Sequence, residues 1–347
     1  MRRVLFFVFL VILLSLPVGA MEFSAPAPPA EAAELLPKEA DSFGEGLWNV
    51  LSAGVKLIAP SMTEAAACCL RVLGAALLTA LVGQLAPGVP KRALELAGVA
   101  AAAALLLEPS VSMVALGTES VAQLREYGKL LLGVLAAALA ATGGVSASTA
   151  LYVGTAFFDA LLGAAVTAVF LPMLWMLLAL SIARAAVGDS ILEKLKKLLR
   201  WLMEWSLKLS LYLFTGYMTI TGVVSGTADA AAGKAARIAI SGAVPVVGGI
   251  LSDAADAVLL SAATLGSGAG VWGILTVIAL FCAPAVKIGC QYLLLKLTAA
   301  ISESLGGCCG ELIGDFAGAM GLLLALVSTQ AVLLLVSSLC FLKGVGG

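Results

Sequence analysis

The sequence contains no histidine, which removes the most common general base and the most common metal ligand of proteins. Its seven cysteines include no pair separated by two residues. Most of them stand in apolar runs, where a thiol packs as a small hydrophobic group; a metal site or a disulfide framework is the alternative. Since no constellation typical of catalysis, cofactor binding or metal binding remains, we expect a protein that is not an enzyme and needs no cofactor.

Charge is also scarce. Charged residues make up 12% of the chain, and the formal net charge is −1, so there is no concentrated basic face for nucleic acid. Hydrophobic residues make up 61%, with a mean hydropathy of +1.09. A soluble domain is about 45–50% apolar and about one quarter charged. The composition therefore predicts an all-α, polytopic integral membrane protein, for which we count about six to eight transmembrane helices.

Apolar runs long enough to cross a bilayer, which takes about 20 residues, occur at 65–86, 93–116, 130–153, 156–187, 206–225, 271–297 and 318–342. The second run is interrupted by Glu108 and Pro109. The fourth is unusually long and contains Pro172, so it is either one kinked helix or two short halves. The runs divide the chain into N-terminal membrane helices at 65–188 and a C-terminal membrane region at 209–347.

The N-terminus has the pattern of a secretory signal peptide. Arg2 and Arg3 precede an apolar core at 4–16, and small residues lead to a cleavage site after Ala20. The alternative for residues 1–20 is an uncleaved first helix. The segment 21–64 begins with a stretch rich in proline, alanine and acidic residues, and we predict that it lies outside the cytoplasm.

The segment 189–208 predicts an amphipathic helix. Its apolar residues recur at spacings of four, three, four and three, which places them on one helical face: Ile191, Leu195, Leu198, Leu202 and Trp205. Such a helix is typical of the membrane interface, although an ordinary connector next to the membrane has the same pattern.

Basic residues indicate the orientation in the membrane. Lys91 and Arg92 follow the first run, and a cleaved signal peptide would place them in the cytoplasm. The basic segment 194–208 is expected on the same side, which requires an even number of crossings between Arg92 and Asp189. Three apolar runs lie there, so either the run with Pro172 is two half-helices or one run does not cross.

The segment 226–260 carries charges on both sides of a proline and glycine break. Arg237 and Asp253 lie eight residues before and after Pro245, and Lys234 and Asp256 lie eleven before and after. One interpretation is a re-entrant hairpin whose arms form ion pairs along a path or gate; the other is a surface loop with solvated charges. The candidate site consists of Asp229, Lys234, Arg237, Pro245, Gly248, Gly249, Asp253 and Asp256.

A glycine repeat follows. Gly306, Gly310, Gly314 and Gly318 recur every four residues and form one helical stripe. Small residues at this spacing let another helix approach closely. The repeat predicts a tight helix contact, within the chain or between copies in a homo-oligomer.

Several of these segments together resemble a known family. They are the helix ending in LLRWLMEWSLKL, the stretch VPVVGGILSDAADAVLLSA, and the run from Pro284 to Lys287 after Trp272. The chain resembles stage III sporulation protein AE of endospore-forming Firmicutes, most clearly over 189–297.

The resemblance implies a multi-pass protein of the mother-cell membrane that surrounds the forespore, in contact with membrane lipid. Its implied partners are the other stage III sporulation A proteins and, across the intermembrane space, forespore protein Q. Together they would form a secretion-like channel or feeding tube. The family has no established catalytic residues to carry over. The alternatives are a stand-alone secondary transporter with broken helices and a membrane-embedded enzyme, for which Asp253 and Asp256 alone do not form a catalytic pair.

Overall fold

The computed structural model describes residues 25–36, 43–85, 90–141, 145–220, 268–304 and 309–346. Within these ranges all regular structure is helical, which confirms the predicted fold class. The elements are α2 (Ala30–Ala33), α3 (Phe43–Leu85), α4 (Lys91–Ala141), α5 (Val145–Ala165), η1 (Val166–Phe170), α6 (Leu171–Val187), α7 (Ser190–Ile220), α10 (Gly268–Ser304) and α11 (Gly310–Gly346).

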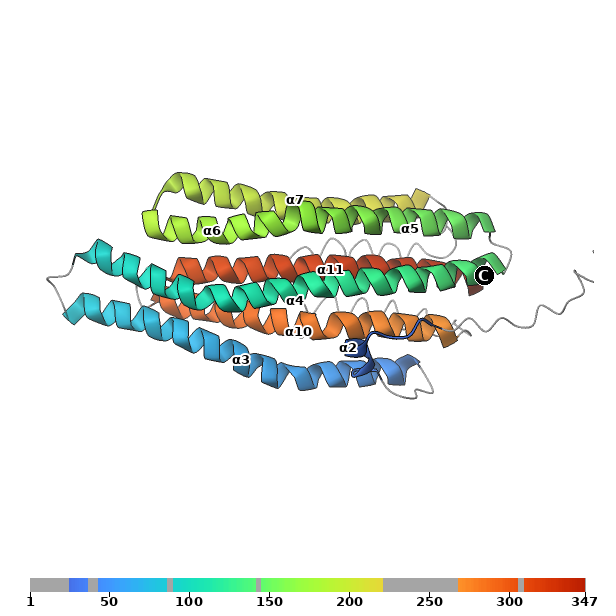
Figure 1. Ribbon diagram of the computed structural model, residues 1–347, viewed down its shortest axis with the longest axis horizontal. Helices are drawn as coiled ribbons and strands as arrows, with labels where there is room; N and C mark the ends of the chain where they lie inside the picture. Colours follow the sequence, from blue (N-terminus) through green and yellow to red (C-terminus); the bar gives the residue numbers. More distant parts are fainter. Residues whose placement is uncertain are drawn as a thin grey trace, which may run out of the picture.

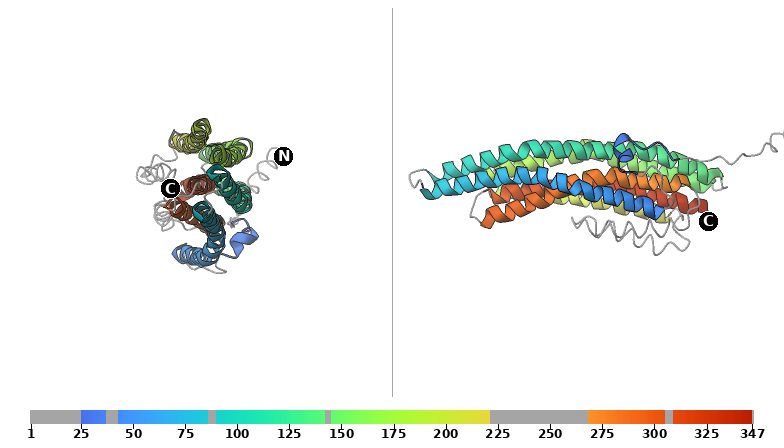
Figure 2. Two further views of the ribbon diagram at one scale, coloured as in Figure 1. Left: turned by 90° about the vertical axis from the view of Figure 1, so that its left-hand side faces the viewer. Right: turned by 90° about the horizontal axis from the view of Figure 1, so that it is seen from below.

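The long helices run side by side in one elongated bundle; α3 and α4 run in opposite directions, and α5 and α6 continue in one direction as a single rod antiparallel to α4 (Figure 1). Viewed along its axis, α11 lies in the centre, with the other helices around it (Figure 2). In the most apolar 18-residue stretch of α11, 78% of the residues are buried, whereas in that of α3 only 28% are buried. The helices therefore differ greatly in how much of their apolar surface other parts of this chain cover.

Among the described residues, five helices are long and apolar enough to cross a membrane: α3, α4, Ser148–Val187, Gly270–Ser304 and Gly310–Leu342. The described residues thus supply five of the six to eight predicted spans. Helices α3 and α4 have 43 and 51 residues. At about 1.5 Å per residue they extend roughly 65 and 75 Å, more than twice the roughly 30 Å hydrocarbon core of a bilayer. Each of these two helices is therefore much longer than one crossing requires.

Between Arg92 and Asp189 the described residues form two candidate spans, α4 and the rod from Ser148 to Val187. Helix α4 continues through Pro109 to Ala141. It therefore contains the whole predicted run 93–116 and the first part of the run 130–153, which are not separate spans. A proline inside a helix costs about 3 kcal/mol, and burial of α4 on α3 and α11 offsets this cost.

The long rod that follows α4 is continuous as well. A single π-helical turn, η1, precedes Pro172, which lies in the first turn of α6 and does not split the rod. A proline is tolerated there because its missing N–H disrupts little hydrogen bonding in a first turn. The chain between Arg92 and Asp189 thus makes two passes, and both basic segments lie at one end of the bundle (Figure 1). We call this end, which carries Lys91, Arg92, Lys194 and Lys197, the basic end.

Two predicted boundaries fall inside helices. Helix α3 begins at Phe43, within the segment 21–64 that we predicted to precede the first span. Helix α7 continues from the amphipathic segment through residue 208 to Ile220 without interruption. The predicted apolar stripe of α7, from Ile191 to Trp205, points away from the bundle and is exposed. This stripe is therefore free to contact membrane lipid.

Candidate functional site

Most residues of the predicted site lie outside the described part of the chain. These are Asp229, Lys234, Arg237, Pro245, Gly248, Gly249, Asp253 and Asp256, as well as Gly306 of the glycine repeat. The re-entrant hairpin therefore remains a prediction.

Three glycines of the repeat lie on α11, and they face two different helices. Gly310 lies against Glu303 of α10, and a Cβ added to Gly314 would be 3.7 Å from the Cβ of Ala299 on the same helix. Gly318 instead lies under the guanidinium group of Arg200 on α7, which a Cβ would overlap. The described part of the stripe is thus engaged by helices of the same chain.

A buried ion pair joins α7 to α11 beside this stripe. The Lys196 ammonium donates hydrogen bonds to both carboxylate oxygens of Asp315, at 2.9 and 2.7 Å. The two side chains are only 10% and 12% exposed. Removing one partner of such a pair leaves an uncompensated buried charge, which costs about 3–5 kcal/mol. The pair therefore holds α7 against the central helix at one rotation and one axial position.

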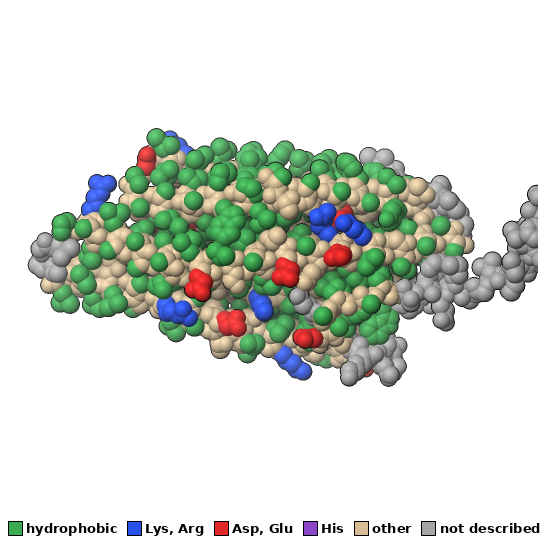
Figure 3. Space-filling view, in the orientation of Figure 1, with side chains coloured by type: hydrophobic (Ala, Val, Ile, Leu, Met, Phe, Trp, Pro, Cys, Tyr) green, Lys and Arg blue, Asp and Glu red, His purple; other side chains and the backbone are tan. Residues whose placement is uncertain are grey.

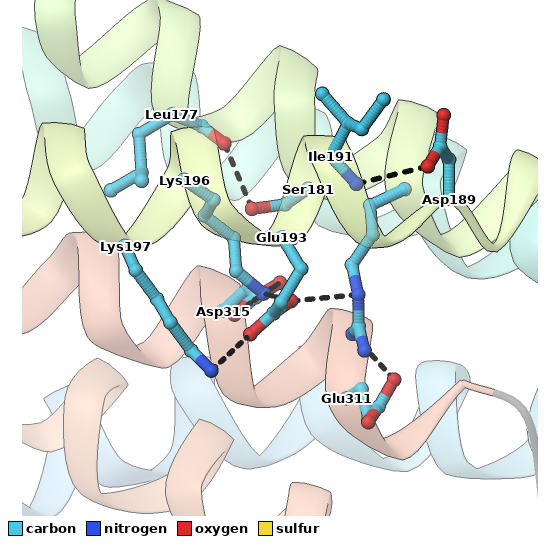
Figure 4. Close-up of polar contacts among 10 residues, drawn as sticks. Leu177, Ser181, Asp189, Ile191, Glu193, Lys196, Lys197, Glu311 and Asp315 are labelled. Carbon is cyan, nitrogen blue, oxygen red and sulfur yellow. Dashed lines mark hydrogen bonds and ion pairs between the residues drawn. The ribbon is translucent and has the colours of Figure 1, made fainter.

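Further charges extend this pair across three helices (Figure 4). Glu193 lies 2.7 Å from Arg184 of α6, 2.9 Å from Lys196 and 3.2 Å from Lys197. Arg184 also donates to Glu311 of α11. We call these residues the charge network; its six members are Arg184, Glu193, Lys196, Lys197, Glu311 and Asp315.

The network contains three cations and three carboxylates, so its charges balance. The hydrogen bond from Lys196 lowers the pKa of Glu193, with a smaller contribution from Lys197. The carboxylate form of Glu193 is thus favoured in the folded protein. The network consequently fixes the turn between α6 and α7 to the start of α11.

A second polar contact lies inside the bundle. Asp159 of α5 is 8% exposed and accepts a hydrogen bond of 2.8 Å from the side-chain amide of Gln330 on α11. Arg125 of α4 approaches the other carboxylate oxygen of Asp159 at 3.4 Å, and its guanidinium lies against Gly163. A buried charge within a membrane bundle needs such partners. Asp159 is recognisable in the sequence as an isolated charge in an apolar run, but its partners are 34 and 171 residues away.

The outer surface is divided by charge. Lys, Arg, Asp and Glu side chains gather over α3 and α4, while the rest of this view is mostly hydrophobic (Figure 3). On α4, the spacings of 11 and 7 residues put three exposed glutamates on one helical face. We call this surface the α3–α4 charged face; its exposed charged residues are Lys56, Glu64, Arg71, Glu108, Glu119, Glu126 and Lys129.

The rod formed by α5, η1 and α6 presents the opposite kind of surface. Every exposed residue between 149 and 179 is uncharged, and its large apolar members include Phe157 and Trp175. We call this surface the α5–α6 apolar face. A face of this composition and length suits the hydrocarbon of a bilayer.

The sequence of the whole bundle matches a known family. The family described as stage III sporulation protein AE matches residues 43–342, which include the charge network, the α3–α4 charged face and the five candidate spans. The chain belongs to the stage III sporulation protein AE family. The resemblance expected from the sequence is confirmed, and family membership supports a role in sporulation.

A curated member of the family is similar over part of its length. Stage III sporulation protein AE of Bacillus subtilis (strain 168) is 25% identical over 190 residues, which are 55% of this chain. The matched part is 48% of the relative, so the chain spans about half the length of the curated relative that it matches. No solved structure matches.

In this member of the stage III sporulation protein AE family, sequence reasoning identified the glycine repeat but missed the charge network. The sequence showed some of the charged residues of the network but not that they meet. Lys197 lies off the predicted apolar stripe of α7, and Glu311 and Asp315 flank the glycine repeat in the sequence, but nothing in the spacing pairs the two segments. Among the described residues, no group of three or more Cys, Asp or Glu side chains lies close enough to hold a metal ion.

Proposed function

We propose that this protein is a membrane component of the channel complex between mother cell and forespore, and that it is not an enzyme. It would lie in the mother-cell membrane that surrounds the forespore. Its partners would be other stage III sporulation A proteins and, through them, forespore protein Q. Family membership supports the sporulation role, and the division of the outer surface supports assembly with other subunits.

The two faces can be compared at the same depth. Ser148 of α5 donates to the carbonyl of Ala136 on α4, and Asp159 lies beside Arg125. These contacts place Glu108, Glu119 and Glu126 of α4 at the same height along the bundle as the α5–α6 apolar face. A slab about 30 Å thick, placed anywhere along the apolar face, therefore includes several charged side chains of the α3–α4 face.

That arrangement is unsuitable for a protein that lipid surrounds completely. An exposed Asp, Lys or Arg at the centre of a bilayer costs about 2.5–3.5 kcal/mol. Several such side chains on one face would together cost about as much as the usual net stability of a folded domain, about 5–15 kcal/mol. The α3–α4 charged face must therefore meet water or other protein, as expected of a subunit that lines or joins a channel. This is the observation that carries the proposal.

Site-specific photo-crosslinking in sporulating cells tests it. A photoreactive amino acid replaces Glu126 on the charged face or, as the matched control at similar depth, Phe157 on the apolar face. We expect protein crosslinks from position 126 and only lipid adducts from position 157. The partners captured would be other sporulation proteins or a second copy of this chain. Equal protein crosslinking from both positions would contradict the proposal.

The buried contact of Arg125, Asp159 and Gln330 supports a second candidate, a stand-alone secondary transporter. Ionisable residues inside a membrane bundle often mark the path of a proton or solute. A transporter would work alone in liposomes, and Asp159→Asn would abolish that transport. Dependence of sporulation on Asp159 without any activity of the purified protein in liposomes would instead favour the complex component.

A further inference from the structure

A groove of about 170 Å³ opens between α7, α10 and α11, one helical turn beyond the charge network. A single water needs about 10–15 Å³ by the same kind of measure, so the groove has room for a polar group much larger than one water. The residues that matter for its chemistry are Arg200, Glu204, Lys208, Tyr292, Lys296 and Gly318.

Glycines of α11 form the floor and create the space. The Arg200 guanidinium lies directly on the backbone at Gly318, where a Cβ would overlap it. A Cβ on Gly321 would lie 3.2 Å from the Tyr292 ring, which is tighter than an ordinary contact. The glycines therefore let two side chains, from α7 and α10, settle deep against the central helix.

The groove carries an excess of positive charge. Arg200, Lys208 and Lys296 face a single acid, Glu204, which leaves two cations uncompensated. Within the described chain, none of these three cations forms an ion pair, whereas Lys196 on the same helix is paired with Asp315. Arg200 and Lys208 are partly buried, and Lys296 is exposed. Partly buried cations without counter-charges are costly, so this cluster favours an anionic ligand.

Exposed apolar and aromatic side chains lie on α7 and α10 close in sequence to the residues that line the groove. Trp201 and Trp205 of α7 are exposed and stack on one another, with ring centroids 6.2 Å apart. Leu293 and Leu297 of α10, on either side of Lys296 in that helix, are also exposed. Tryptophan is enriched where membrane meets water. The ligand that fits these surroundings has an anionic head and apolar chains.

We propose that this groove binds the phosphate of an anionic phospholipid headgroup, with the acyl chains along the exposed apolar residues of α7 and α10. Basic residues at the basic end indicate that this end faces the cytoplasm. Anionic lipids are abundant in the cytoplasmic leaflet, and basic pockets between helices on that side bind their headgroups. The site does not depend on membership of a channel complex.

Native mass spectrometry of the full chain, purified in detergent, tests the site. The protein is titrated with phosphatidylglycerol, with phosphatidylcholine, and with inorganic phosphate. The first two lipids share their acyl chains and differ in net charge. We expect phosphatidylglycerol to bind at least tenfold more tightly than phosphatidylcholine, and inorganic phosphate to leave that binding unchanged at equimolar concentration.

Variants locate the binding. Arg200→Gln combined with Lys296→Gln should weaken phosphatidylglycerol binding by about fivefold for each charge removed, or about 25-fold together. Lys194→Gln is the matched control, because it removes an exposed cation of α7 that does not line the groove. We expect this control to change binding by less than twofold. Lys296→Gln alone alters only an exposed side chain, so it tests the site even if the double variant fails to fold.

Three results would overturn the proposal. The first is equal binding of the two lipids by the wild-type protein. The second is tight phosphatidylglycerol binding that survives in Lys296→Gln and in the double variant. The third is displacement of phosphatidylglycerol by equimolar inorganic phosphate, which would identify a site for free phosphate rather than for lipid.

Discussion

Two neighbouring positions along the contact between α7 and α11 differ in chemistry because a different residue of α11 lies at each. Lys196 and Arg200 lie one helical turn apart on α7, and both side chains reach α11. Lys196 meets the carboxylate of Asp315, whereas Arg200 meets Gly318. The first position is a closed ion pair that fixes the helices. The second is an open cationic groove in which the guanidinium remains available to a ligand.

The difference follows from the α11 residue at each position. An aspartate supplies both bulk and negative charge, so Lys196 is neutralised within the chain. A glycine supplies neither, so space and positive charge remain at Arg200. The glycine repeat, which predicted close helix packing, thus also creates room for a side chain from a third helix. The predictions below test this contrast, in order of decreasing expected effect.

The largest effect is expected where the buried pair is broken. Lys196→Met leaves Asp315 buried without its partner, and we expect a loss of about 3–5 kcal/mol in the free energy of unfolding. Urea unfolding of the protein in mixed micelles, followed by tryptophan fluorescence, measures the loss. The control is the double variant with Asp315→Leu, which removes both charges and should recover most of the stability. A double variant as unstable as the single one would argue against a paired interaction.

A smaller effect is expected at the open position. Gly318→Ala forces the Arg200 guanidinium away from α11. Because this group is the far end of a flexible side chain, we expect a loss at the low end of the range of about 1–3 kcal/mol that overpacking costs. Gly314→Ala is the matched control, since its Cβ would make an ordinary contact of 3.7 Å with Ala299. The control should be neutral or slightly stabilising, because alanine favours a helix over glycine by about 1 kcal/mol. Equal destabilisation by both changes would contradict the different surroundings of the two glycines.

The charge network should also respond to pH. Because the pKa of Glu193 is lowered in the folded protein, its stabilisation is fully present above the ordinary glutamate pKa. It is lost as the pH falls through the lowered folded pKa. Melting temperatures recorded from neutral to acidic pH should therefore fall more steeply for the wild type than for Glu193→Gln. Parallel curves would show that Glu193 contributes no such linkage.

The smallest effect is expected at the edge of the network. Lys197 pairs with Glu193 at 3.2 Å, but its side chain is 73% exposed. Exposed pairs of this kind contribute about 0–1 kcal/mol. Lys197→Gln should change the free energy of unfolding by less than about 0.5 kcal/mol, and high salt should remove even that difference. A loss comparable to that of Lys196→Met would mean that exposure does not distinguish the two lysines.

Much of the architecture could be predicted from local patterns. The apolar runs indicated membrane helices, and the four-three spacing of α7 identified the stripe that the structure places outward. Helix ends were harder to predict. In the sequence, the charged residues of α4 between Glu108 and Lys129 separate two apolar runs, so the pattern did not reveal that 93–116 and 130–141 belong to one helix. Pro109 and Pro172 indicated interruptions locally, but packing against neighbouring helices and a π-helical turn accommodate them.

The amino-acid sequence by itself determined that the protein is helical and lies in a membrane, which family it belongs to, and which face of α7 points outward. These properties depend on composition and on the spacing of residues along one helix. Only the tertiary structure decided that Lys196 meets a carboxylate and Arg200 a glycine, and that Asp159 meets Arg125 and Gln330. The partners of Lys196 and Asp159 on α11 are 119 and 171 residues away. Such meetings depend on the rotation and axial position of each helix, which the packing of many apolar side chains sets together.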